Sequence, residues 1–329
     1  MKNEHICQLL TPGNGLPCMH YIRPELKGEP GFCCQPTRFR CTEAMKHHLP
    51  AISYSRMTDF IACRRKYYLG VVEGLQVKPE QLPEAIKLGR AWDAYLHHLY
   101  DRGFDHTQEI QSLQLSPEQR AKLSALTRAY QDLEMAIDRE DLLGCQYKIH
   151  IPIGTTNIIG FVDRAYETHI VESKFSSRPD FYAQRENVTY QLGTYFLANE
   201  RCEYAVVEIA RVPALRTGQG RYEDEDPADF EKRIYSDIVS RPAHYFIGWD
   251  RKTKTYGTKF WRSELPLDEV FSTYVHVLQE IDRAAQEGAW YRNNLACHVP
   301  APCPYLPIKR TGVVSDEIYE RRKKGGEKA

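Results

Sequence analysis

The chain has 329 residues, 42% of them hydrophobic, so it can bury a large core and form one principal domain with additions. Lys plus Arg and Asp plus Glu each number 44, which excludes a global basic field and leaves only a local path for nucleic acid. No apolar run is long enough to cross a bilayer, and the first residues do not resemble a secretory leader. We expect a cytoplasmic protein without a membrane partner, whose ten cysteines serve metal binding rather than disulfides.

The N-terminal stretch, residues 1–48, is rich in Cys, Pro and Gly and has little apolar periodicity. It cannot bury much core, and bound zinc would compensate for the missing hydrophobic burial. The spacing of its thiols is irregular, so reduced, partly buried cysteines are the alternative. The candidate zinc ligands are Cys7, Cys18, Cys33, Cys34 and Cys41.

Two helices are expected next. A Ser or Thr of residues 53–58 caps the first, which runs into Cys63 and two tyrosines, and Cys63 on its own reads as a small core residue. The second covers residues 84–102, with an apolar stripe on one side and Asp93 and His97 four residues apart on the other. A third helix opens at Ser116-Pro-Glu-Gln, in the favoured order of cap and then proline.

The centre of the chain reads as a β-hairpin preceded by a strand at residues 146–153. β-Branched and aromatic residues fill both arms, residues 158–163 and 169–174. The hairpin brings Asp163 close to Glu172, and the period of two places Glu172 and Lys174 on one face. Two carboxylates and a backbone carbonyl form a hard-oxygen site suited to Mg²⁺ or Mn²⁺. A solvated sheet face is the alternative for such a triplet.

Residues 181–200 are expected to form a helix with Gln191 and Tyr195 four apart on one face, and residues 204–212 a further buried strand. The order strand, strand, strand, helix, strand predicts an α/β core. A helix at 227–240, a strand pair at 244–250 and 256–262, and a long helix at 266–287 follow, and the last leads to Cys297 and Cys303. From Ser315 the tail is charged, and we expect it to be flexible.

These motifs, in this order, resemble the PD-(D/E)XK nucleases: Asp163 precedes Glu172-Ser-Lys174, and Gln191-x-x-x-Tyr195 follows. The last element is similar to the RecB/AddB-like branch, including the iron–sulfur exonucleases of CRISPR adaptation. The resemblance implies a restriction-endonuclease-like fold, a central mixed sheet flanked by helices, with helical insertions and the small Cys-rich N-terminal module. It also implies hydrolysis of DNA with Mg or Mn.

The resemblance assigns roles to individual residues. Asp163, Glu172 and the Ser173 backbone carbonyl hold the metal, Lys174 activates water, Gln191 positions Lys174 or the phosphate, and Tyr195 lines the site. The family usually has a metal-binding histidine four residues after a glycine in the second helix. Counting from Gly89 reaches Asp93. We expect Asp93 to replace that ligand, with His97 or His98 as the alternative.

The resemblance further implies an iron–sulfur cluster that closes the two ends of the domain. Cys63, Cys297 and Cys303 match three of its ligands, whereas Lys309 stands at the fourth position. A [4Fe-4S] cluster normally requires four thiolates. We predict a cluster completed by an N-terminal cysteine, Cys41 being nearest in sequence, with loss of the cluster as the alternative.

The sequence thus predicts three parts: the module at 1–48, a nuclease domain at 49–310 and a charged tail at 311–329. The domain divides into a helical part at 53–140, a catalytic core at 141–215 and a helical and cluster-binding part at 216–310. The expected activity is that of a DNA exonuclease acting on ends or single strands. The alternative is a weak or inactive DNA-end-binding subunit of a repair, recombination or defence complex.

Overall fold

The computed structural model describes residues 50–101, 107–135, 137–154, 156–217, 224–298 and 302–322, together with the backbone of β1 (Tyr21–Ile22) and β2 (Phe32–Cys33). The side chains proposed to bind zinc, Cys7, Cys18, Cys33, Cys34 and Cys41, lie outside these described residues, so the zinc site stays a prediction. Within the described ranges no helix combines the length and the apolar character that crossing a membrane requires.

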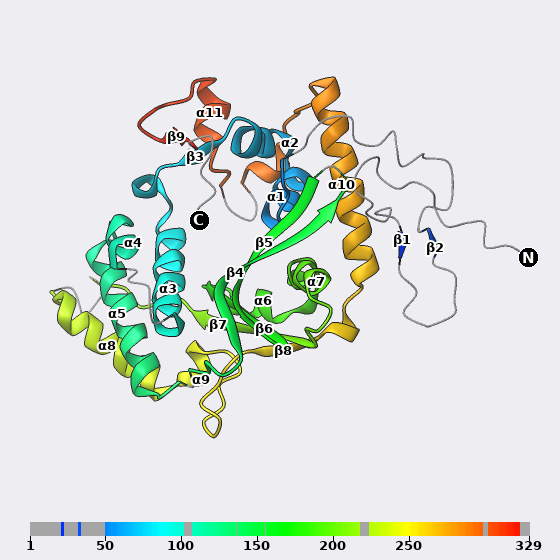
Figure 1. The fold of residues 1–329 in the computed structure, drawn as a ribbon. Helices are drawn as coiled ribbons and strands as arrows, with labels where there is room; N and C mark the ends of the chain where they lie inside the picture. Colours follow the sequence, from blue (N-terminus) through cyan, green and yellow to red (C-terminus); the bar gives the residue numbers. More distant parts are fainter. Residues whose placement is uncertain are drawn as a thin grey trace, which may run out of the picture. The chain divides into compact units, whose positions relative to one another are not determined.

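A five-stranded mixed sheet in the order β4-β5-β6-β7-β8 forms the core of the fold (Figure 1). Strands β5 and β6 form the predicted antiparallel hairpin, β6 and β7 are parallel, and β7 and β8 are antiparallel. Helices flank this sheet, so the predicted restriction-endonuclease-like α/β core is confirmed. The strands are β4 (Leu142–Ile153), β5 (Thr156–Tyr166), β6 (His169–Ser176), β7 (Tyr204–Arg211) and β8 (Thr258–Trp261).

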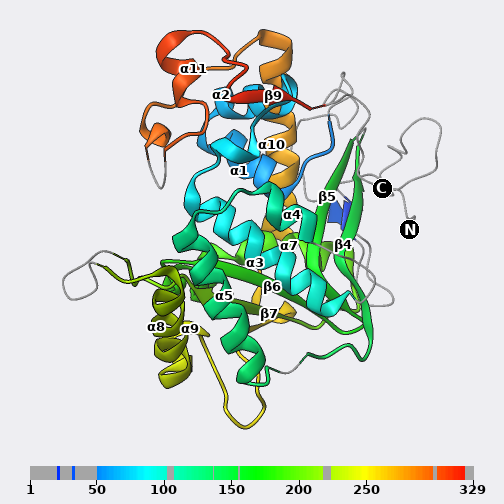
Figure 2. The same ribbon diagram turned by 90° about the vertical axis from the view of Figure 1, so that its left-hand side faces the viewer.

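Successive side chains of β7 point to opposite faces of the sheet and show which helices cover each face. Ala205, Val207 and Ile209 are buried in one core with α7 (Thr189–Ala198). Ala210, of opposite parity, is buried in a second core with α3 (Glu84–Tyr100), α5 (Pro117–Asp132) and α8 (Pro227–Ser240). Figure 2 shows α5 lying between α3 and α8. Since side chains alternate across a strand, each face requires its own helical cover.

The local sequence explains where α5 begins. Ser116 caps α5 with a capping box, in which its side chain accepts from the Gln119 N–H and the Gln119 side chain accepts from the Ser116 N–H. Pro117 follows at the first helical position. Helix α5 ends at Asp132, before the end of the apolar pattern that continues to Ile137 in the sequence.

The single helix predicted for residues 181–200 is wrong in its first half. The chain forms α6 (Pro179–Ala183), then a 3₁₀ turn at Arg185–Asn187, and only then α7. Gln184 adopts extended backbone angles between them, which interrupts the helical hydrogen bonds. The break leaves Gln191 and Tyr195 on one uninterrupted helix.

The strand pair predicted at 244–250 and 256–262 is only half correct. Pro242 opens a short helix, α9 (Pro242–Tyr245), and the following residues make isolated bridges rather than a strand. Gly248 has a φ of +78°, and a Cβ there would come within 2.6 Å of the Gly257 carbonyl oxygen. This close backbone approach needs glycine and prevents a continuous ladder. The second arm forms β8.

The described chain divides into two compact units. Of the described residues, those within 50–74, 150–160 and 268–309 form one unit, and those within 75–149, 161–267 and 310–322 form the other. The first contains α1 (Tyr54–Ala62), α2 (Arg64–Tyr67), the π-helical turn Tyr68–Val72, nearly all of α10 (Leu267–Glu287), the 3₁₀ turn Leu295–Cys297 and most of α11 (Leu306–Thr311). The second also contains α4 (Thr107–Ser112) and the 3₁₀ turns Pro79–Gln81 and Arg262–Glu264.

The charged tail, expected to be flexible from Ser315, is ordered as far as Arg322. Strand β9 (Tyr319–Arg321) pairs antiparallel with β3 (Leu75–Val77), and Tyr319 is buried. The burial of Tyr319 and the backbone pairing of β9 with β3 order this segment despite the charged residues on either side. The charge of the segment alone did not predict this order. Residues 323–329 lie outside the described part.

Candidate active site

The β5–β6 hairpin creates the centre of the candidate site. The register pairs Arg164 with Val171, and continuing it by one step sets Asp163 opposite Glu172. The Ser173 N–H donates a 2.8 Å hydrogen bond to Asp163 Oδ2. The hairpin thus brings Asp163 beside the strand of Glu172, as predicted, and the backbone of that strand also fixes the Asp163 carboxylate.

Glu172, Lys174, Gln191 and Tyr195 form one hydrogen-bonded chain. Lys174 Nζ lies 2.5 Å from Glu172 Oε1 and 3.0 Å from Gln191 Oε1. Gln191 Nε2 donates to Glu172 Oε1 at 2.6 Å and contacts the Tyr195 hydroxyl at 3.0 Å, and that hydroxyl donates to the Phe161 carbonyl. The spacing of four on α7 therefore brings Gln191 to β6 and the Tyr195 hydroxyl to β5.

The electrostatics of the carboxylates differ from those of surface acids. Burial and the neighbouring Glu172 charge raise the pKa of Asp163 to about 7, against the opposing Ser173 hydrogen bond and Lys174 charge. Burial alone would lower the pKa of Lys174, but the Glu172 carboxylate outweighs it and raises that pKa above its ordinary value. Lys174 therefore remains an ammonium at neutral pH.

Asp93 and Asp163 line one small cavity in this unit. The cavity measures about 10 Å³ and also borders His97, Gln146, Arg164 and Ser173, close to the minimum that holds one water or ion. Part of the Asp93 side chain is exposed to solvent. The protein packed around it, and then the Asp163 and Glu172 charges, raise the pKa of Asp93 well above its ordinary value. His97 lies 3.5 Å from Asp101. His98 does not border the cavity, so Asp93 and His97 remain the two candidates.

The donor set fits Mg²⁺ or Mn²⁺, which prefer carboxylate oxygens. Glu172 Oε2 is buried and has no hydrogen-bond partner among the described residues. Both Asp163 oxygens accept hydrogen bonds, from Gln146 and from Ser173. In the described ranges no three His, Cys, Asp or Glu side chains are already gathered closely enough to hold a metal ion. The carboxylate oxygens that would hold a metal ion are therefore present. The role of the Ser173 carbonyl as a further metal ligand stays a proposal.

Arg164 is a residue of this site that the sequence analysis missed. It is almost fully buried, forms an ion pair with Glu208 and donates to the Ser173 hydroxyl at 2.9 Å. Its guanidinium lies 4.3 Å from the centre of the Tyr100 ring. A charged residue on the strand face that also carries Ile158 and Val162 was the available signal, because charged residues are buried only with partners.

The predicted cluster ligands gather in the other compact unit. Cys63, Cys297 and Cys303 line one cavity of about 30 Å³ together with Lys309. Lys309 Nζ lies 2.8 Å from Cys297 Sγ and donates to Asn294 at 2.7 Å. The described residues thus supply three thiols and a cation, and alone they do not fit a four-thiolate cluster. Cys41, the proposed fourth ligand, lies outside the described part.

An α/β sheet carrying paired carboxylates and a lysine on adjacent strands defines the class of metal-dependent phosphodiester hydrolases. The sequence model of the PD-(D/E)XK nuclease superfamily matches residues 51–308, and the chain belongs to that superfamily. Members are nucleases that usually use Mg or Mn, so membership indicates a hydrolase acting on DNA. No curated protein matches the chain.

Proposed function

We propose that the chain is a DNA exonuclease of the RecB/AddB-like branch, acting on DNA ends or single strands with Mg or Mn. The observation that carries this proposal is the contact of Gln191 with both Glu172 and Lys174. The Gln-x-x-x-Tyr element of that branch thereby meets the Glu-x-Lys strand. A purely structural helix would not need polar side chains aimed at a buried carboxylate.

The residues divide the chemical work as follows. A bound divalent ion would supply positive charge at the phosphate and a water of lowered pKa. Asp163 and Glu172, with Asp93, would hold that ion. Lys174, kept charged by Glu172, would orient the attacking water and offset charge on the phosphate rather than accept a proton. Gln191 fixes the Lys174 ammonium, and Tyr195 fixes Gln191.

Cleavage of end-labelled DNA tests this proposal. The wild-type protein should degrade single- or double-stranded substrate with Mn²⁺ or Mg²⁺ and not in EDTA. Lys174→Ala should lower the rate at least about a hundredfold, as expected for a lost electrostatic group, while circular dichroism stays unchanged. Lys122→Ala is the matched control, because Lys122 is a part-buried lysine on α5 that pairs with Glu118 at 2.6 Å. Full activity in EDTA or in Lys174→Ala would refute the assignment.

A second candidate is a weak or inactive DNA-end-binding subunit of a repair, recombination or defence complex. Asp93, in place of the family's usual histidine, and Lys309 Nζ on Cys297 favour it. A scaffold would tolerate both changes. DNA binding without cleavage, equal in wild type and Lys174→Ala, is the result that selects it. In either case we propose helicase, nuclease or CRISPR adaptation proteins as partners.

A further inference from the structure

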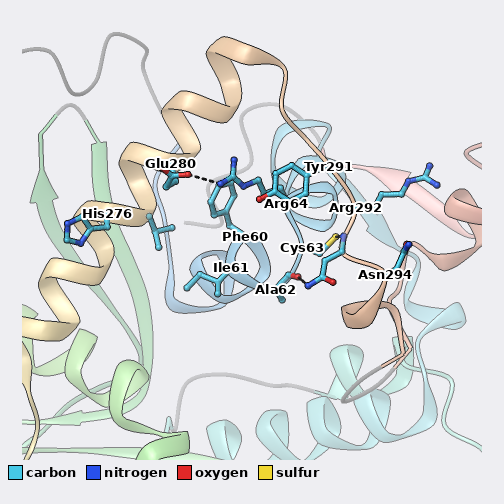
Figure 3. A pocket seen from close by; sticks show the side chains of 12 residues that line it. Phe60, Ile61, Ala62, Cys63, Arg64, His276, Glu280, Tyr291, Arg292 and Asn294 are labelled. Carbon is cyan, nitrogen blue, oxygen red and sulfur yellow. Dashed lines mark hydrogen bonds and ion pairs between the residues drawn. The ribbon is translucent and has the colours of Figure 1, made fainter.

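A cavity of about 440 Å³ lies in the unit that holds the cysteines, well away in sequence from the carboxylates. Figure 3 shows its walls: α1 and the start of α2 on one side, α10 on another, and the chain from Tyr291 to Asn294. Its volume is in the range of small-molecule pockets, which is sufficient for one nucleotide. None of its residues takes part in the carboxylate site, and Cys63 also lines the thiol cavity.

Arg64 forms a rigid centre in this cavity. Its guanidinium lies 5.1 Å from the centre of the Phe60 ring and 4.8 Å from that of Tyr291. Its Nη2 also lies 2.7 Å from Glu280 Oε2, and its side chain is only 18% exposed. Three fixed contacts hold the planar group in place (Figure 3). The Arg64 cation thus lies against one face of the Tyr291 ring.

Tyr291 presents the rest of its ring to solvent. The residue is 60% exposed, and Ile61 beside the cavity is 58% exposed. A ring with a cation on one face is electron-poor and favours an electron-rich π-system on the other face. Exposed aromatic and aliphatic side chains together mark a contact surface. A planar, electron-rich ligand suits this surface.

The charge around the cavity is positive. Glu280, its only acidic lining residue, is paired on one oxygen with Arg64 and on the other with Arg283 at 2.8 Å. Arg292 also lines the cavity and is exposed. Its Nη1 donates a long hydrogen bond of 3.3 Å to the Lys309 carbonyl, and within the described part of the chain it makes no ion pair. A guanidinium next to a stacking ring is the pairing that recognises a base and its phosphate.

We infer that this cavity binds an unpaired nucleotide of single-stranded DNA, with the base stacked on Tyr291 and a phosphate contacted by Arg292. A duplex does not expose base faces, so the site selects single-stranded segments. The inference rests on the proposed function, because it assumes a DNA substrate. It adds a base-stacking site to the nuclease, outside the carboxylate centre.

Binding measured without cleavage tests the inference. Fluorescence anisotropy of labelled dT20 and of a blunt duplex of equal length, with full-length protein in EDTA, gives both affinities. Tyr291→Ala should weaken dT20 binding roughly 5- to 100-fold, the loss of one base–ring stack, and leave duplex binding within about twofold. Tyr291→Phe should bind like wild type, because the ring is kept. Arg292→Ala should lower the salt slope on dT20 by about 0.7.

Trp261→Ala is the matched control, since Trp261 is also an exposed ring, at 44%, but lies on β8. It should not change dT20 binding. Unchanged dT20 affinity in Tyr291→Ala would overturn the inference and leave the cavity to a protein partner. An equal loss on dT20 and duplex, or no binding of dT20 by wild type, would overturn it too. These outcomes do not bear on metal-dependent cleavage, which Lys174→Ala decides separately.

Discussion

Arg164 donates a hydrogen bond to the Ser173 hydroxyl at 2.9 Å, while the Ser173 N–H donates to Asp163, the residue before Arg164. One buried arginine thus steadies the strand that holds the first metal-binding carboxylate. It also carries the charge that Glu208 neutralises in the interior.

Arg164→Met should destabilise the fold by about 3–5 kcal/mol, because it leaves Glu208 buried and uncompensated. Urea denaturation followed by circular dichroism measures this. Ser173→Ala, which removes one hydroxyl, should cost only about 1 kcal/mol. Arg164→Met/Glu208→Leu should recover part of the loss, since no charge remains unpaired. A loss below about 1 kcal/mol in Arg164→Met would contradict the role given to this pair.

The sequence predicted the hairpin, because strand periodicity places Glu172 and Lys174 on one face. Helix periodicity places Gln191 and Tyr195 on one face, but only the family resemblance implied that this face belongs to the same site. The sequence did not predict Arg164. The pattern marks a charge in an apolar strand but cannot identify Glu208, 44 residues later, as its partner. Long-range ion pairs depend on strand order, which local periodicity does not encode.

Errors at element boundaries have a similar origin. The break at Gln184 and the turn at Gly248 come from single backbone conformations, the latter at a φ of +78°. The gathering of Cys63 with Cys297 and Cys303 followed from the family resemblance and not from any local pattern. The hydrogen bond from Lys309 to Cys297 could not be predicted, because sequence alone shows only that a cysteine is missing.

Asp93 should contribute more to the metal site than His97. Asp93→Asn should weaken Mn²⁺ binding at least about tenfold, because it removes a charged oxygen donor, whereas His97→Gln should have a smaller effect. Isothermal titration calorimetry with Mn²⁺ measures both. His98→Gln, which alters a histidine outside the cavity, serves as the control. A larger loss in His97→Gln would transfer the ligand role to the histidine.

Stability of the metal-free protein should fall as the pH rises from about 4 to 7, in part through Asp163. Its folded pKa of about 7 exceeds the ordinary value of 3.8, so its protonated form stabilises the fold below pH 4 and this contribution is lost as pH rises through 7. Each pH unit in that window costs up to about 1.4 kcal/mol.

Thermal melting in EDTA at pH 5 and pH 8, compared between wild type and Asp163→Asn, isolates this contribution. The amide cannot ionise, so the variant should lose less stability between the two pH values. Adding Mn²⁺ at pH 8 should raise the melting temperature of wild type more than that of the variant. Identical pH dependence in both proteins would show that Asp163 ionises normally in the fold.

The last prediction concerns Lys309 and the three thiols around it. Because Lys309 Nζ contacts Cys297 Sγ, a four-thiolate cluster in this chain requires a ligand from elsewhere, and we expect Cys41 to provide it.

Cys41→Ala should lose the iron and sulfide of anaerobically purified protein and its visible absorption. Adding Lys309→Cys to that variant should restore them, since four thiolates then surround the cavity. Lys309→Ala, which removes the cation without adding a thiol, is the control and should not restore iron. Iron retained in Cys41→Ala would exclude Cys41 as the ligand, and wild type without iron that gains it in Lys309→Cys would show that the cluster has been lost from this chain.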